Sequence, residues 1–161
     1  MKLTKSKFRR FIDCRNEFWL DHHFPEQVED SLEYQLRREA GYEVERLARQ
    51  LPIFRENSGI NVKVGDEFDT DDLYAKADIV VTDPETGEID IYEVKSGTRA
   101  KPEYVIDLAF QCDVATLAGF YVRKAYLVFL DTEYVFDGEL DVSRLLIMSD
   151  ETEAVRARSA T

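Results

Sequence analysis

The stretch that decides the fold runs from residue 73 to residue 95 and reads LYAKADIVVTDPETGEIDIYEVK. Its two apolar segments, residues 73–82 and 89–94, have the length and composition of β-strands. Residues 83–87 (DPETG) separate them and carry the Asp, Pro and Gly that favour a tight turn. Residues 73–95 are therefore predicted to form a β-hairpin.

Three ionisable residues lie at one end of this hairpin. Asp78 stands just before the apolar run of the first strand, and Glu93 and Lys95 flank Val94 at the end of the second. Because side chains alternate along a strand, Glu93 and Lys95 are expected on one face of the sheet. A tight turn would bring Asp78 close to them, so two carboxylates and a lysine are predicted to converge at one edge of the sheet.

Such a group of side chains suits a Mg²⁺ or Mn²⁺ ion, which takes oxygen ligands from one or two carboxylates and completes its shell with water. The backbone carbonyl of Val94 is a further candidate oxygen ligand. The bound ion would lower the pKa of a water molecule, and Lys95 would orient that water or stabilise charge on a phosphate. The alternative is an amphipathic strand in which Glu-Val-Lys occurs by chance.

The rest of the chain predicts a single α/β domain over residues 1–150, with a central mixed β-sheet flanked by α-helices. Residues 151–161 are predicted to be a polar C-terminal tail that frays. The further elements expected from hydrophobic spacing are helices from Thr4 or Ser6 to about Leu20, from Pro25 to Gln50 and from Pro102 to Tyr121, strands over 60–68 and 125–130, and a short strand over 134–136.

The net charge of −12 argues against a general nucleic-acid binder, because backbone phosphates attract Lys and Arg. Residues 1–23 nevertheless hold six bases against three acids. Lys7, Arg9 and Arg10 in this basic stretch are candidate phosphate contacts, and a solvated helix face is the alternative.

The cysteines and the apolar runs suggest the compartment. Cys14 and Cys112 are the only cysteines and provide no disulfide framework. The longest apolar runs are far short of the roughly 20 residues that a membrane helix needs, and the N-terminus lacks the apolar core of a signal peptide. A cytoplasmic protein without membrane contact is expected.

Several segments, in this order, resemble RecB/Cas4-like members of the PD-(D/E)XK nuclease superfamily, and among them an uncharacterised bacterial RecB-like family. The segments that carry the resemblance are residues 3–8 (LTKSKF) with Cys14 and residues 19–20 (WL), then 41–48 (GYEVERLA), 77–80 (ADIV), 92–97 (YEVKSG), 107–111 (DLAFQ), 128–134 (VFLDTEY) and 138–141 (GELD). The resemblance implies a restriction-endonuclease-like core.

The resemblance also implies roles for individual residues. Glu45, Asp78 and Glu93 would ligate the metal, Lys95 would be the catalytic lysine, and Gln111 would contact DNA or orient that lysine. Helical phase points Glu45 away from the apolar stripe of its helix, so Glu43 is the alternative ligand.

The expected function is a Mg²⁺- or Mn²⁺-dependent nuclease that hydrolyses phosphodiester bonds, either as a DNA exonuclease or as a single-strand nuclease. Its partner would be DNA, or RNA in its place. No Fe–S cluster is expected, because such a cluster needs four cysteines and this chain has two. The alternative is a non-catalytic binding module or subunit that retains the fold and engages a protein partner.

Overall fold

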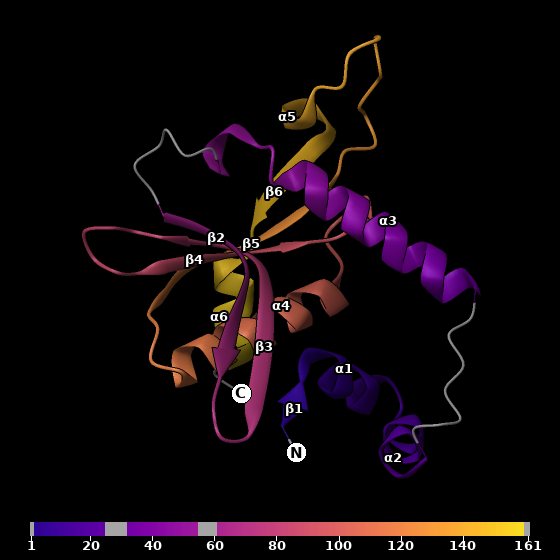
Figure 1. Cartoon of the computed structure of the whole chain (residues 1–161), viewed down its shortest axis with the longest axis vertical. Helices are drawn as coiled ribbons and strands as arrows, with labels where there is room; N and C mark the ends of the chain where they lie inside the picture. Colours follow the sequence, from indigo (N-terminus) through magenta and orange to yellow (C-terminus); the bar gives the residue numbers. More distant parts are fainter. Residues whose placement is uncertain (1, 25–31, 55–60, 160–161) are drawn as a thin grey trace.

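The structure is a computed structural model that describes residues 2–24, 32–54 and 61–159. A six-stranded mixed sheet forms its centre and carries helices on both faces (Figure 1). This architecture confirms the predicted class, a mixed β-sheet flanked by α-helices. Within the described residues, no helix is long and apolar enough to cross a membrane.

The predicted hairpin is the middle of the sheet. Its strands β3 (Leu73–Thr82) and β4 (Ile89–Val94) pair antiparallel, as the sequence predicts. Strand β2 (Asn61–Asp69) pairs antiparallel with β3, and β5 (Val122–Leu130) pairs parallel with β4. The outer strands are β6 (Leu146–Asp150), antiparallel to β5, and the short β1 (Leu3–Thr4), parallel to the start of β3.

Helices cover the two faces of the sheet. On one face lie α4 (Pro102–Leu117) and α6 (Thr152–Ser159), and on the other lies α3 (Leu32–Ala48). The N-terminal helix α1 (Lys5–Asp13) sits beside α4 and β1, and α2 (Arg15–His23) packs on α1 (Figure 1). A 3₁₀ helix, η2 (Pro52–Phe54), follows α3, and a short helix, α5 (Val142–Leu145), precedes β6.

Two hydrophobic cores hold these layers together, one on each face of the sheet. The core under α4 and α6 includes Phe68, Val80, Ile91, Leu108, Val114, Leu127 and Val155. The core under α3 includes Val44, Ala48, Leu51, Phe54, Ile79, Tyr92 and Val128. The sheet is therefore buried on both faces, which is why Ile79, Val80 and Val81 of β3 form a continuous apolar run.

Several element boundaries differ from the prediction. The first helix is two helices, because the backbone is extended at Cys14 (φ −156°, ψ 107°). The described part of the second predicted helix begins at Leu32, and residues 25–31 lie outside the described residues. Residues 134–136 form no strand; the partner of β5 is β6.

The C-terminal segment, predicted to fray, forms helix α6. Thr152 accepts a hydrogen bond from the Ala125 backbone N–H at 3.1 Å, and Val155 is buried against the core. The prediction was wrong because it judged the segment by its overall polarity, whereas one apolar residue per turn is enough to dock a short helix.

Candidate active site

The candidate site lies where the two strands of the hairpin separate. Pairing between β3 and β4 ends at Ile79 and Tyr92, so Asp78 and Glu93 occupy the first positions beyond the last pair. The Val94 backbone N–H, which has left the ladder, donates instead to Asp78 Oδ2 at 2.7 Å. The sequence prediction that Asp78 approaches the Glu-x-Lys segment is thereby confirmed.

The alternation of side chains between the two faces of the sheet is interrupted in β3 at the same point. Ala77 packs into the core under α4, whereas Ile79, two residues later, packs into the core under α3. Regular alternation would place both on one face. In β2, Gly65 lies between the residues that pair with Ala77 and Ile79 and has a left-handed φ of +65°. The twist at Asp78 is therefore shared by both strands and turns the Asp78 carboxylate out of the core.

Glu93 is the centre of the site and is only 1% exposed. Its Oε1 forms ion pairs with the ammonium groups of Lys95 and Lys5, each at an N–O distance of 2.7 Å. Its Oε2 accepts a hydrogen bond from Gln111 Nε2. The prediction that Glu93 and Lys95 share a face is confirmed by this contact.

Helix α4 supplies the third wall. Gln111 and Asp107 lie one helical turn apart, and both face the end of β4. Asp107 Oδ2 binds the Lys95 ammonium at 2.7 Å, so Lys95 is held between two carboxylates. Among the described residues, the buried Gln111 Oε1 has no hydrogen-bond partner, which leaves one oxygen in the site free for a water or a ligand.

The electrostatics of the two carboxylates differ. Burial and, after it, the nearby Glu93 carboxylate raise the pKa of Asp78 to about 7, and Glu45 adds to this rise. Burial also disfavours the charged form of Glu93, but Lys5 and Lys95 outweigh burial and lower the pKa of Glu93. Negative charge at Asp78 is thus poorly compensated, whereas Glu93 is ionised.

Lys95 remains an ammonium ion. Burial favours its neutral form, but Glu93 and Asp107 outweigh burial and raise the pKa of Lys95 above its ordinary value. Lys95 therefore provides a fixed positive charge and N–H donors, and it does not serve as a base in this arrangement.

The helix α3 ligand predicted from the resemblance also lies near the site. Glu45 is close enough to Asp78 to raise its pKa and forms an ion pair with Arg49. Glu43, the alternative, is exposed and pairs with Arg46 along the helix. The structure therefore brings Glu45 toward Asp78 and leaves Glu43 in solvent.

The three predicted phosphate contacts lie in α1 and have different surroundings. Arg9 is turned inward: its Nη1 donates to the Glu103 carbonyl at 3.0 Å, and its Nε lies 3.5 Å from Asp107 Oδ1. Arg10 pairs with Asp21 of α2. Lys7 is half-buried, and no ion pair of its ammonium is found among the described residues. Arg9 thus belongs to the site itself rather than to an outer surface.

Lys5, Asp107 and Tyr104 were not predicted as site residues. The Lys95 ammonium lies 5.1 Å from the centre of the Tyr104 ring, a cation–π distance. Asp107 stands four residues before Gln111, so helical spacing was a usable signal for it. Lys5 lies 88 residues before Glu93 in sequence, and no local pattern links the two.

The donor set fits a hard divalent cation in kind. Asp78, Glu93 and Glu45 are carboxylates whose mutual repulsion a cation would relieve. In the described part of the chain, no three His, Cys, Asp or Glu side chains are grouped closely enough to hold a metal by themselves. A site with one or two direct carboxylates and the remainder water, as Mg²⁺ prefers, matches both observations.

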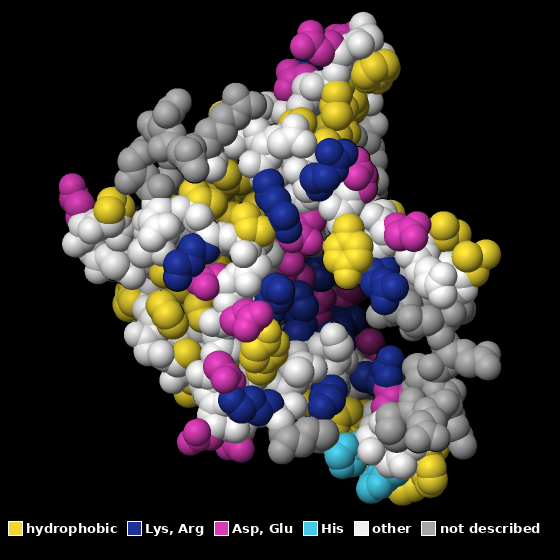
Figure 2. Space-filling view, viewed as in Figure 1, with side chains coloured by type: hydrophobic (Ala, Val, Ile, Leu, Met, Phe, Trp, Pro, Cys, Tyr) yellow, Lys and Arg dark blue, Asp and Glu magenta, His cyan; other side chains and the backbone are white. Residues whose placement is uncertain are grey.

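The surface around the site is hollowed. In Figure 2 acidic side chains lie in a depression between α1 and α3, and several Lys and Arg side chains lie in it and at its edge, with hydrophobic and acidic ones among them. An anionic ligand would meet positive charge at the rim before it reached the carboxylates.

Comparisons with known proteins bear on the fold. No protein-family model and no curated protein matches this chain. The crystal structure of SSO0001 aligns with 99% of this chain and 73% of that chain, with a TM-score of 0.56 and 13% sequence identity. At that identity the likeness shows a shared fold alone.

Proposed function

We propose that this chain is a Mg²⁺- or Mn²⁺-dependent nuclease of the RecB/Cas4-like PD-(D/E)XK type, with a restriction-endonuclease-like core. The observation that supports it most strongly is the convergence, at the separated ends of β3 and β4, of Asp78, Glu93 and Lys95. This set brings together two carboxylates that can hold a metal ion and a permanent cation that can stabilise charge on a phosphate, a combination that suits metal-assisted hydrolysis of a phosphodiester.

Each residue would have a distinct role. Asp78 and Glu93 would hold the cation directly and Glu45 through water, and the bound ion would supply Lewis-acid stabilisation and a water of lowered pKa. Lys95, kept charged by Glu93 and Asp107, would stabilise negative charge on the phosphate. Gln111 holds the Glu93 carboxylate in position through its Nε2.

The substrate would be DNA, or RNA in its place, and the rim of Lys and Arg in Figure 2 supports an anionic polymer. The overall charge of −12 disfavours binding elsewhere on the surface. A protein that contacts nucleic acid only near its active site suits a substrate end or a single strand, and therefore an exonuclease or a single-strand nuclease.

Cleavage of labelled single- and double-stranded DNA with Mn²⁺, Mg²⁺ or EDTA tests the proposal. Lys95→Met should lower the rate by about 100-fold or more, because it removes the charge that stabilises the transition state. Lys124→Met is the matched control, since Lys124 pairs with Asp150 on the exposed side of β5. Equal rates for wild type and Lys95→Met would contradict the proposal.

A non-catalytic binding module is the second candidate. It is favoured by the engagement of both Glu93 oxygens, which contact Lys5, Lys95 and Gln111. A module of this kind would bind an oligonucleotide or a protein partner without cutting. Absence of cleavage by the wild type under every metal, together with retained binding, would favour this candidate.

A further inference from the structure

Helix α1 places a second lysine in the site. Lys5 is the first residue of α1, and its ammonium reaches the same Glu93 Oε1 atom that Lys95 contacts. Lys95 is additionally fixed by Asp107 at 2.7 Å, whereas the ion pair of Lys5 found among the described residues is the one with Glu93. Lys5 is also the more exposed of the two, at 26% against 17%. Of the two ammonium groups on Glu93, that of Lys5 is the easier to displace.

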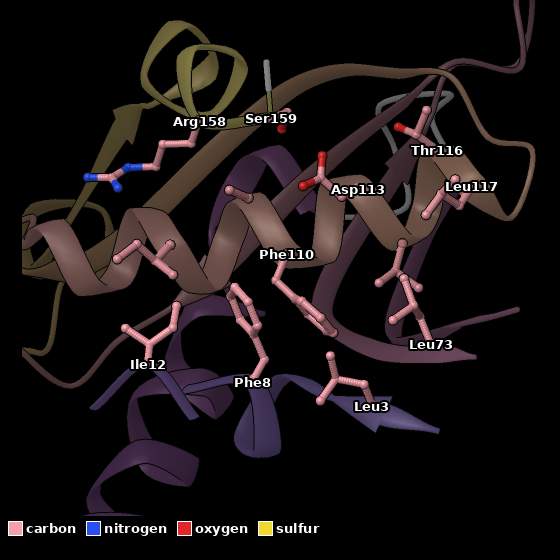
Figure 3. Close-up of a pocket in the computed structure, with 13 residues that line it drawn as sticks. Leu3, Phe8, Ile12, Leu73, Phe110, Asp113, Thr116, Leu117, Arg158 and Ser159 are labelled. Carbon is pink, nitrogen blue, oxygen red and sulfur yellow. The ribbon is translucent and has the colours of Figure 1, made fainter. Parts of the chain in front are cut away.

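Helix α1 is held on its inner side by Arg9, which contacts Glu103 and Asp107, and by one aromatic stack. It has no fully buried residue, and its main apolar contact is the stacking of Phe8 on Phe110 at 5.0 Å. A cavity of about 770 Å³ lies along this contact, between α1, β1, α4 and α6 (Figure 3). The stacking of Phe8 on Phe110 thus holds the helix against α4 independently of the Lys5 side chain.

The charge of Glu93 is already compensated without any added ion. Its single negative charge meets two ammonium groups, those of Lys5 and Lys95, each 2.7 Å from Glu93 Oε1. A divalent cation bound by Glu93 would add two positive charges next to two ammonium groups. Repulsion at such distances is strong away from bulk water, and the departure of one ammonium would relieve it.

We infer that Lys5 is an exchangeable counter-ion of the site: it neutralises Glu93 in the free protein and is displaced when Glu93 binds a divalent cation. This inference rests on the proposed function. The displaced ammonium stays tethered to the N-terminus of α1, beside the site, where it adds to the positive rim for a phosphate. Lys5 is thus a positioning residue that sets cation affinity.

Mn²⁺ binding to the full chain, measured by electron paramagnetic resonance of the free ion, tests this inference. Lys5→Met and Lys5→Gln should bind Mn²⁺ at least about tenfold more tightly than wild type, because the competing charge is gone. Lys5→Arg should stay close to wild type. Lys2→Met, which breaks an exposed ion pair with Asp69, is the matched control and should change the affinity less than about twofold.

The outcomes separate the two proposals. Equal Mn²⁺ affinity in wild type, Lys5→Met and Lys5→Gln would overturn the role of Lys5 and leave the nuclease proposal intact. A lowered melting temperature without tighter Mn²⁺ binding would likewise reduce Lys5 to a structural residue. Mn²⁺ binding that is absent in all variants, or unchanged in Glu93→Gln, would overturn the metal site and the inference with it.

Discussion

At the scale of single residues, Asp78 is the carboxyl group of the site whose charged form is disfavoured by its surroundings. Its carboxylate lies beside Glu93 and Glu45 and its pKa is raised to about 7, chiefly by burial. A carboxyl whose pKa is higher in the folded than in the unfolded chain stabilises the fold at low pH. That contribution is lost as the pH rises from about 4 through about 7.

Asp78→Asn should therefore stabilise the protein at pH 8, by about 1 kcal/mol or more. The amide removes the charge and keeps an oxygen that accepts the Val94 N–H. Thermal melts between pH 5 and pH 8 should fall with pH in wild type and fall less in Asp78→Asn. Asp71→Asn, an exposed acid in the turn before β3, is the control. Parallel pH profiles for wild type and Asp78→Asn would show that Asp78 is not the group responsible.

The two cysteines should differ sharply in reactivity. Cys112 is 5% exposed, and burial raises its pKa to about 12, so its thiolate is scarce at neutral pH. Cys14 lies at the break between α1 and α2 and is half-buried. Titration with a chromogenic disulfide at pH 8 should show one fast thiol in the native protein and a second only in denaturant. In Cys14→Ser the fast phase should vanish, and its persistence would contradict this assignment.

The sequence predicted the residues of the site better than their partners. Asp78, Glu93 and Lys95 lie within one hairpin, so strand periodicity and a turn signal were enough to bring them together. Lys5 and Arg9 reach the site through the packing of α1 on α4, which depends on tertiary contacts such as Phe8 with Phe110. Helical phase alone favoured Glu43, because it ignores where the end of β3 lies relative to α3.

At the scale of elements, the twist of β2 and β3 beside Asp78 depends on a glycine. Gly65 has φ +65°, and a Cβ there would meet Lys76 Cε at 2.9 Å. Gly65→Ala should destabilise the fold by about 1 kcal/mol, because L residues pay for a left-handed backbone.

The matched control for Gly65 is Gly41→Ala, in the interior of α3. Outside the backbone of its own helix, no atom of the described residues lies within 4 Å of a Cβ at Gly41, so helix propensity alone should stabilise the protein by about 0.5–1 kcal/mol. Urea denaturation of both variants should give opposite signs. The same sign for both would show that the backbone at Gly65 imposes no special demand.

Helix α6 offers a second test at this scale. Val155 is 4% exposed and belongs to the core under α4, so Val155→Ala should cost about 1–2.5 kcal/mol in free energy of unfolding. Val135→Ala, at a residue that is 69% exposed, should cost less than about 0.5 kcal/mol. Similar small effects at both positions would mean that the C-terminal segment is peripheral, as its composition suggested.

The elements that escaped prediction are short or depend on partners. β1 has two residues and exists as a strand only because β3 continues past the end of β4. β6 presents Ile147 and Met148 to solvent at the edge of the sheet, so it lacks a clear alternation. The long, buried strands β3 and β4 carried their own signal, and their predicted bounds match the structure.

At the scale of the whole molecule, charge is segregated rather than uniform. The chain carries −12 overall, yet several Lys and Arg side chains lie in the acidic depression of Figure 2 and at its edge. A phosphate that approaches this face is attracted by the rim and repelled by Asp78 and Glu93. A divalent cation on those carboxylates would neutralise their charge and remove the repulsion, so substrate binding and cation binding should be coupled.

Fluorescence anisotropy of a labelled single-stranded oligonucleotide should therefore show weak binding in EDTA and about tenfold tighter binding with Ca²⁺, a coupling of about 1.4 kcal/mol. The salt dependence should correspond to about two to four phosphates, because the rest of an acidic surface repels the strand. Glu93→Gln is the control and should remove the Ca²⁺ effect while the weak binding in EDTA persists. The coupling between oligonucleotide and cation depends on the carboxylates Asp78 and Glu93 at the floor of the depression. Tight oligonucleotide binding that does not change with the cation would therefore place the nucleic-acid surface away from the site and favour the binding module.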